Sequence, residues 1–396
     1  MNARTMAGNG AGWKRRVVVL ALPLLIVTVF IVMWRRTVLM VPGNIVPSGP
    51  PRAEFILAGS VYDLGYNYRH YLGHRAISAR LMSKIDSRVH QGISPATFQE
   101  KVQSLCQSGA SLIFSTDELY KRSCRQLAQE NPDVVFLQFT ASPKWMAPQR
   151  LANLSTYGIR DWEGAYVCGV IAGHAIPGAS AFGFVAPHPG PPTPWVANAF
   201  ALGCQRANPH VRVEIFYTGS WHDPDKEIEA LKEMSSRQIS AVYFLTNFPA
   251  TAFKVAEESG MRVLSHYSDL SSFAPSSWIT GCLWHWSSLY EQVTHQALSG
   301  ERKSGSYWGG LRERYISLGP FGPDVPGSAM QKAKDIIEQI ISGRLSVFSG
   351  PVYDNRGGLR IGQGEILSDS ETLSCDWLVG VVSEYKVIDG AAEPLD

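Results

Sequence analysis

The chain has 396 residues, with 36 Lys and Arg against 34 Asp and Glu and a formal net charge of +2. Charged residues make up only 18% of it, which argues against nucleic-acid binding, because that function usually needs a concentrated basic face. Hydrophobic residues make up 45% and aromatic residues 11%, so the chain is globular rather than disordered, and its length predicts two or three domains.

An uncharged apolar run occupies residues 17–34, with basic residues at 14–16 before it and at 35–36 after it. As a helix, this run would span roughly 27 Å, close to the thickness of the hydrocarbon core of a bilayer. The run ends without the small residues of a signal-peptidase site, and no cysteine lies just after it for lipidation, since the first is Cys106. We therefore expect a transmembrane anchor or an uncleaved signal at 17–34.

The charges around this run favour a cytoplasmic tail at residues 1–16 and a folded part outside the cytoplasm. Residues 35–53 are rich in proline and glycine, which predicts a linker between membrane and folded part. The predicted location is thus the cell membrane, with the folded part in the periplasm or extracellular space. The alternative for 17–34 is a buried core helix, which would leave the flanking charges and the linker without a purpose.

From Glu54 onward, short apolar runs alternate with helical patterns in two series. The first series predicts strands at 55–61, 111–115 and 134–139, and helices at 68–85, at a segment ending near 129, and at 162–175. The second series predicts strands at 181–186, 211–217, 241–245 and 262–266, and helices at 195–206, 225–236 and 250–259. This alternation is typical of parallel sheets with helices on both faces, so the sequence predicts an α/β protein with two lobes.

Polar and aromatic side chains follow nearly every predicted strand. In open α/β sheets the ligand lies beyond the carboxyl ends of the strands, so these residues are candidate ligand contacts. They are Asp63, Tyr66, Asn67, Thr116, Asp117, Trp221, Asn247 and Asp269.

Two aromatic side chains across a cleft can sandwich a flat ring, and Tyr66 and Trp221 are the best candidates for this role. The carboxylates of Asp63 and Asp269 can accept two hydrogen bonds from a diol or from ring N–H groups, and the amides at Asn67 and Asn247 both donate and accept. Together these groups suit a neutral, flat ligand with polar edges.

Several of these residue types also have structural interpretations. Asp223 precedes Pro224 and is expected to cap a helix, and Asp117 is as well suited to a cap as to a ligand. His70 and His74 are spaced like metal ligands, but without a third ligand they are expected on a solvated helix face.

The sequence contains no nucleophile elbow, no phosphate-binding loop and no H-E-x-x-H motif, so we expect no enzyme, no catalytic residues and no cofactor. The six cysteines are widely scattered without metal-ligand spacing, so no metal site is expected and most should be buried.

Five segments in this order resemble the basic membrane protein family, the purine-nucleoside-receptor-like substrate-binding components of ABC transporters. They are YDLGYN (62–67), NLSTYGIRDWEGAYVCGVIAG (153–173), FALGCQRANPHVRVEIFYTGSWHDPDKEIEAL (200–231), HYSD (266–269) and GGLRERYISL (309–318). The resemblance runs from about residue 55 to 347. It implies a type I periplasmic binding protein fold, in which two Rossmann-like lobes joined by three crossovers close on a ligand at the hinge.

The resemblance also implies roles for individual residues. Asp63 and Asn67 match the polar residues of the family's first loop, Tyr66 and Trp221 match its ring-stacking aromatics, and Asp269 matches its ribose-binding carboxylate.

Two departures from the family pattern concern the ribosyl group. Thr140 stands where the family often has Asp, and Trp284 stands where many members have Lys. The loss of these charges and the gain of a ring make a free nucleobase or another planar heterocycle as suitable a ligand as a nucleoside, and they add Trp284 to the candidate site.

This resemblance gives the domain expectations. They are lobe 1 at 54–175 plus 278–318, lobe 2 at 176–277 plus 319–348, and a C-terminal extension at 349–396. The expected function is an extracytoplasmic solute-binding protein that captures a purine-like ligand and presents it to an ABC permease. The alternative is a ligand-sensing ectodomain that signals through a membrane partner.

Overall fold

The computed structural model describes residues 49–395 except 147–149, 301–303 and 389–390. The predicted tail, the apolar run at 17–34 and most of the predicted linker lie outside these residues. In the part that is described, no helix is both long and apolar enough to cross a membrane.

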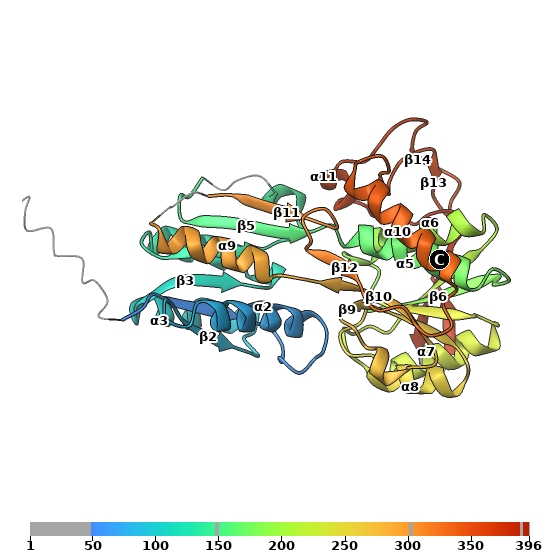
Figure 1. Ribbon diagram of the computed structural model, residues 1–396, viewed down its shortest axis with the longest axis horizontal. Helices are drawn as coiled ribbons and strands as arrows, with labels where there is room; N and C mark the ends of the chain where they lie inside the picture. Colours follow the sequence, from blue (N-terminus) through green and yellow to red (C-terminus); the bar gives the residue numbers. More distant parts are fainter. Residues whose placement is uncertain (1–48, 147–149, 301–303, 389–390, 396) are drawn as a thin grey trace, which may run out of the picture. The chain divides into compact units, whose positions relative to one another are not determined.

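Lobe 1 is built on a parallel six-stranded sheet with the order β11-β5-β4-β3-β1-β2, and helices flank this sheet (Figure 1). The strands are β1 (Arg52–Ile56), β2 (Asp86–His90), β3 (Ala110–Ser115), β4 (Val135–Phe139), β5 (Leu154–Ile159) and β11 (Ser306–Gly309). The helices are α2 (Tyr66–Arg80), α3 (Pro95–Gln107), α4 (Lys121–Glu130) and α9 (Ser287–Leu298).

Successive residues of β1 show why these strands are apolar throughout. Phe55 packs on His74 of α2 and Tyr290 of α9, whereas the next residue, Ile56, belongs to the cluster formed with α3 and α4. Helices therefore cover both faces of the sheet, as is usual for parallel sheets.

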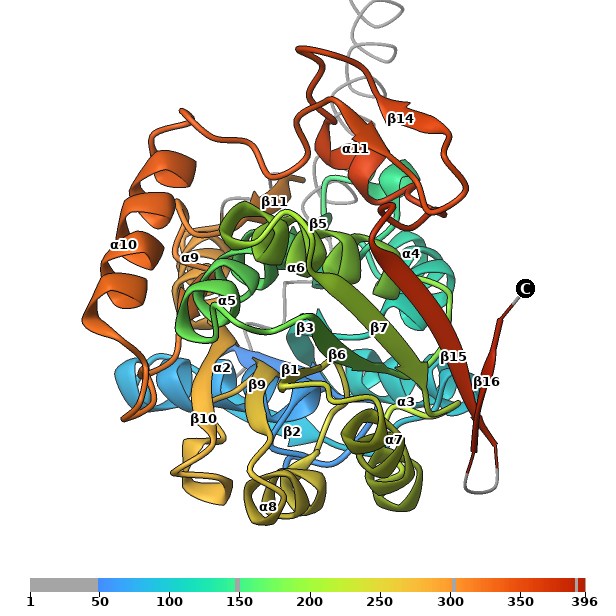
Figure 2. The same cartoon turned by 90° about the vertical axis from the view of Figure 1, so that its right-hand side faces the viewer.

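Lobe 2 contains an eight-stranded sheet with the order β12-β10-β9-β8-β6-β7-β15-β16. The strands are β6 (Ala181–Ala186), β7 (Arg212–Tyr217), β8 (Ala241–Phe244), β9 (Arg262–Tyr267), β10 (Trp278–Trp284), β12 (Ile316–Leu318), β15 (Val382–Ile388) and β16 (Ala391–Pro394). Its helices are α5 (Asp161–Ala175), α6 (Thr193–Ala207), α7 (Pro224–Ser236), α8 (Ala250–Glu258) and α10 (Gly327–Ile341). Helices α5, α6 and α10 lie on one face of the sheet, and α7 and α8 lie on the other (Figure 2).

Helices α5 and α6 cross at unusually close range. A Cβ atom at Gly169 would lie 2.1 Å from the carbonyl oxygen of Phe200, and one at Gly203 would lie 2.1 Å from that of Tyr166. Only glycine permits this approach of two backbones, which explains the small residues of the VCGVIAG and FALGC segments.

Three crossovers join the lobes, between β5 and α5, between β10 and α9, and between β11 and β12. Helix α5 and strands β10 and β12 thus belong to lobe 2, although the ranges expected from the sequence assigned residues 161–175, 278–284 and 316–318 to lobe 1. The positions of the crossovers could not be predicted from composition, because strands and helices are equally apolar in both lobes.

The segment after residue 349 adds structure to lobe 2. It contains a hairpin of β13 (Val352–Tyr353) and β14 (Leu359–Ile361), a short helix α11 (Asp369–Thr372), and then β15 and β16. Strand β15 pairs in parallel with β7, so the extension continues the sheet of lobe 2 (Figure 2).

Several local predictions can be compared directly with the structure. Strand β6 has the predicted bounds, and Asp223 caps α7 as expected, since its Oδ1 accepts a hydrogen bond of 3.1 Å from the N–H of Lys226. Five of the six cysteines are buried, also as expected. Several elements were not predicted, among them β2, α3, β5, β10 and α9.

The prediction for His70 and His74 was wrong. His70 is fully buried and stacks on Trp286 with ring centroids 5.2 Å apart, and His74 is 8% exposed. The face of α2 that carries them packs under α9, because α9 returns from lobe 2 to cover it. That long-range return could not be predicted from the spacing of two histidines.

Candidate ligand-binding site

A cavity of about 520 Å³, here called the main cavity, lies between the lobes at the carboxyl ends of their strands. This volume is in the range of small-molecule sites. Lobe 1 lines it with Ala58, Gly59, Tyr66, Asn67, Asp117, Glu118, Leu119 and Phe139. Lobe 2 lines it with His188, Pro191, Trp221, Asn247 and Tyr267.

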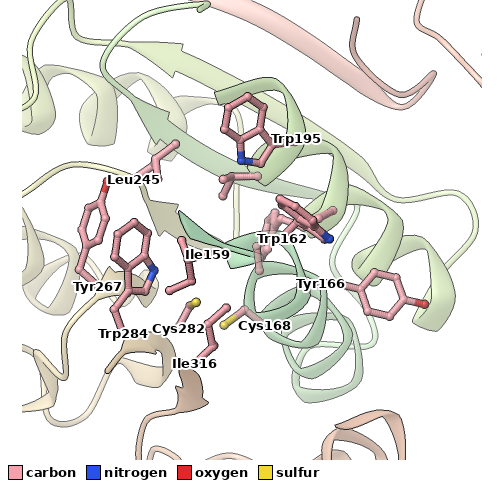
Figure 3. Close-up of a cluster of buried hydrophobic side chains, with 14 of the residues drawn as sticks. Ile159, Trp162, Tyr166, Cys168, Trp195, Leu245, Tyr267, Cys282, Trp284 and Ile316 are labelled. Atoms are coloured by element: carbon pink, nitrogen blue, oxygen red, sulfur yellow. The ribbon is translucent and has the colours of Figure 1, made fainter. Parts of the chain in front are cut away.

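A smaller space of about 70 Å³, here called the inner chamber, adjoins the main cavity. The two spaces share the side chains of Tyr66, Phe139 and Tyr267. The remaining walls of the inner chamber are Thr140, Ala141, Ile159, Asp161, Pro192, Trp195, Trp284 and Leu373. Figure 3 shows four of these walls, Ile159, Trp195, Tyr267 and Trp284, gathered around the same region of the core.

Tyr66 is held rigidly where the two spaces meet. Its hydroxyl donates a hydrogen bond to the carbonyl oxygen of Thr116, and burial raises the pKa of Tyr66 well above its ordinary value. Its ring meets those of Phe139, Tyr267 and Trp284 edge-on, at centroid distances of 5.7, 5.9 and 5.7 Å. These four rings thus form one aromatic surface where the two spaces meet.

Tyr267 adopts a conformation that is rare for an aromatic residue. Its φ is +73°, in the left-handed region, which costs on the order of 1–3 kcal/mol, and such residues cluster at functional sites. The ring lies edge-on to Trp284, with centroids 4.8 Å apart. This turn at the end of β9 places the ring against both spaces.

The carboxylate of Asp63 is occupied by the start of α2. It accepts hydrogen bonds from the N–H groups of Gly65, Asn67 and Tyr68 and, at 2.8 Å, from the Asn67 side chain. The side-chain oxygen of Asn67 accepts from the N–H of Gly59. Asp63 therefore fixes the wall that Asn67 forms, and it does not itself line the cavity.

Asn247 brings an unpaired acceptor to the main cavity. Its backbone N–H donates to the carbonyl oxygen of Trp221 at 2.8 Å, which fixes the loop after β8 beside the loop after β7. Its side-chain oxygen is buried and has no hydrogen-bond partner among the described residues. A buried acceptor of this kind favours a ligand that carries an N–H or O–H donor.

The charged side chains that line both spaces are acidic. Asp117 and Glu118 line the main cavity, Asp161 lines the inner chamber, and no Lys or Arg of the described chain lines either. Asp117 also caps the short helix η1 (Glu118–Tyr120), and burial raises its pKa although the N–H of Leu119 opposes the rise. Such a site suits a neutral or cationic ligand and repels a phosphate.

The structure brings five of the eight predicted site residues to these spaces. Tyr66, Asn67, Trp221 and Asn247 line the main cavity, and Trp284 lines the inner chamber.

The other three predicted residues, Asp63, Thr116 and Asp269, line neither space. Thr116 is buried, and its hydroxyl donates to the carbonyl oxygen of Ile56. Asp269 is exposed and accepts from the N–H of Ser271 at the start of the short helix η3 (Ser271–Phe273). The left-handed turn at Tyr267 places Tyr267, and not Asp269, at the cavity.

Other lining residues were missed in the sequence. Tyr267 follows directly after a predicted strand and could have been chosen by the same rule as Asp269. His188 lies in the loop after β6, edge-on to Trp221 with ring centroids 5.6 Å apart. Asp161 comes two residues after β5, a strand that the sequence analysis did not predict, and Leu373 reaches the inner chamber from the C-terminal extension.

Comparison with known proteins agrees with this arrangement. The family model described as "ABC transporter substrate-binding protein PnrA-like" matches residues 51–349. A purine-binding protein of Brucella abortus is 28% identical over 334 residues, which cover 84% of this chain and 93% of that protein. A candidate glucose-binding protein of an ABC transporter in Haloferax volcanii is 22% identical over 311 residues, with 77% of each chain covered.

A solved structure supports the fold. A solute-binding protein of an ABC transporter from Conexibacter woesei superposes with a TM-score of 0.62 at 20% identity, over 75% of this chain and 98% of that one. The two lobes, the crossovers and the position of the main cavity are those of an α/β periplasmic binding protein. Because the family model matches most of its length, the chain belongs to the PnrA-like, or basic membrane protein, family of ABC transporter substrate-binding proteins.

Proposed function

We propose that this protein captures a purine nucleobase or nucleoside outside the cytoplasm and presents it to an ABC permease. The ligand would lie in the main cavity between Tyr66 of lobe 1 and Trp221 of lobe 2, with Asn247 and Asp117 at its polar edge.

The observation that carries this proposal is the composition of the cavity wall. Aromatic rings line the cavity from both lobes, and its charged groups are acidic. The side-chain oxygen of Asn247 can accept a hydrogen bond from a ligand, because it has no partner among the described residues. A purine base is flat, carries N–H donors and has no negative charge. The purine-binding relative in Brucella abortus supports the same ligand class.

Contact between the lobes supports binding by closure. Gly65 of lobe 1 lies against the backbone of Asn247 of lobe 2, so closely that a Cβ atom would lie 2.1 Å from the carbonyl oxygen. A ligand that touches both lobes favours this closed arrangement over an open one, since it gains contacts only when they meet.

The proposal can be tested with a thermal-shift screen of the purified protein against adenine, guanine, hypoxanthine, their nucleosides, AMP and glucose. A ligand that binds only the folded state raises the Tm. We expect a rise with bases or nucleosides, and none with AMP, because its phosphate meets no cation. A rise with glucose and none with any purine would contradict the proposal.

We further propose that the apolar run at 17–34 is retained and anchors the protein. Mass spectrometry of the N-terminus of the membrane-bound protein tests this. A mature chain that begins beyond residue 37 would show that the run is removed.

A further inference from the structure

The C-terminal extension begins where the match to the family ends, at residue 349. Its short helix α11 is well defined, because Ser368 and Glu371 form a capping box. The Ser368 hydroxyl accepts from the N–H of Glu371, and the Glu371 carboxylate accepts from the N–H of Ser368 at 2.8 Å. The residue that follows this helix, Leu373, is therefore held in a defined place.

Leu373 is 5% exposed and lines the inner chamber, in company with Tyr66, Phe139 and Trp284. The other residues that line this chamber lie within 51–349, the part that matches the family model. Leu373 is therefore the residue through which the extension lines the chamber. An aliphatic side chain at this point fixes how far the apolar wall extends beside Trp284.

The extension is tied firmly to lobe 2. The side-chain amide of Asn198, fully buried in α6, donates to the carbonyl oxygen of Trp377 and accepts from the N–H of Val379, both at 2.8 Å. Strand β15 then continues the sheet beside β7. The extension is thus an integral part of the lobe rather than a loose tail.

The extension is also tied to the hinge. Nε of Arg160 donates to both carboxylate oxygens of Asp369, at 2.9 and 3.0 Å, and Nη1 donates to Glu313 at 3.3 Å. Arg160 lies in the crossover between β5 and α5, and Glu313 lies in the crossover between β11 and β12. In addition, α11 lies beside the short helix η2 (Pro143–Trp145) of lobe 1. The segment around α11 therefore contacts both lobes and two of the three crossovers.

We propose that residues 369–373 form part of the binding site. Leu373 is a specificity-determining wall that limits the length of ligand at the inner end, and the Arg160–Asp369 ion pair is a positioning contact that holds this wall against the hinge. The ligand class named in the test rests on the proposed function, whereas the wall and the ion pair do not.

The wall is tested with Leu373→Ala, which enlarges the inner chamber. The probes are adenine and hypoxanthine and their monomethyl derivatives, with Kd measured by calorimetry for each. For each methyl derivative we compare its affinity with that of the parent base. For at least one derivative, we expect this ratio to be about tenfold or more higher in Leu373→Ala than in wild type, because one methyl group provides discrimination of this size in a fitted pocket.

Leu378→Ala is the matched control, because Leu378 is also buried in the extension, at 6% exposure, but lines neither space. It should lower the Tm and leave the affinity ratios unchanged. Leu373→Met, which nearly conserves volume, should keep the wild-type ratios. If folded Leu373→Ala keeps the wild-type affinity ratios, Leu373 does not limit the length of the ligand.

The ion pair is tested without any ligand. The N–H of Gly310 donates to Glu313, so hydrogen exchange there should accelerate in Asp369→Asn if the pair holds the hinge. If hydrogen exchange at Gly310 is the same in Asp369→Asn as in wild type, the Arg160–Asp369 ion pair does not hold the hinge. If the wild-type protein binds no purine, only the proposed function is contradicted. The role of Leu373 would then be tested with the solute that raises the Tm and with its next larger homologue.

Discussion

Trp221 and Tyr66 line the main cavity from opposite lobes, but their surroundings differ. Both side chains are partly exposed, but the ring of Tyr66 meets those of Phe139 and Trp284, whereas the ring of Trp221 meets that of His188 in a loop. Removal of Trp221 therefore takes away a ligand surface, while removal of a fully enclosed ring would take away part of the core.

Trp221→Ala should weaken binding of the purine ligand by roughly 1–3 kcal/mol, the range for loss of one stacked aromatic ring. The Tm of the unliganded protein should change little. Calorimetry and thermal unfolding measure the two effects. Trp278, which is 1% exposed, provides the contrast, because Trp278→Ala should lower the Tm strongly. An equally large fall for Trp221→Ala would make that residue part of the core.

Glu163 shows how a single buried carboxyl can make stability depend on pH. Burial raises its pKa from an ordinary value of 4.5 to about 7, although the N–H of Leu311 and the charge of Arg160 oppose the rise. Glu313 and Asp369 lie near it and add to the rise. Because the folded state holds this proton more tightly than the unfolded state, the stability that the carboxyl contributes is present below pH 4.5 and lost as the pH rises through 7.

Glu163→Gln should remove this pH dependence, since glutamine can accept the same hydrogen bond from Leu311 without a charge. We expect the free energies of unfolding of variant and wild type to agree near pH 4. At pH 8 the variant should be more stable, by at most about 3 kcal/mol, because one pKa unit corresponds to about 1.4 kcal/mol. Denaturant titrations at several pH values measure the difference. A constant difference at all pH values would contradict the assignment.

Among the elements, the loop between β1 and α2 of lobe 1 contacts lobe 2 across the cleft. Leu64 has a φ of +48° and packs against the lobe 2 cluster that contains Phe253. The next residue, Gly65, touches the backbone of Asn247. A loop held at its base by Asp63 therefore provides a contact surface for lobe 2 that exists only when the lobes are together.

Gly65→Ala should oppose closure, because a Cβ atom there would lie 2.1 Å from the carbonyl oxygen of Asn247. We expect ligand affinity to fall at least tenfold, or about 1.4 kcal/mol, with less effect on the Tm of the unliganded protein. Gly178→Ala is the control, since a Cβ atom at Gly178 would meet no atom within 4 Å. Wild-type affinity in Gly65→Ala would show that the contact is not needed for binding.

At the scale of the whole molecule, the sites and the hinge depend on segments that are distant in sequence. The inner chamber combines Tyr66 with Trp284 and Leu373. The ion pairs of Arg160 join two crossovers and the extension. Ligand contact, hinge geometry and the C-terminal segment are thus parts of one arrangement.

The α/β class, the family and many of the elements could be predicted from residue patterns alone. The apolar runs at β6 and β7 and the Asp-Pro start of α7 are local signals, and their periodicity and capping chemistry act over a few residues. The rule that ligands meet the carboxyl ends of strands likewise selected Tyr66, Asn67, Trp221 and Asn247, because it depends only on where strands end.

Three features could not be predicted in this way: the lobe that contains α5 and β10, the position of Tyr267 rather than Asp269 at the cavity, and the contact of Leu373 with the inner chamber. The physical reason is the same in each case. These features depend on which segments pack together over long distances and on one left-handed turn, and neither the apolar pattern nor local propensity distinguishes between the alternatives.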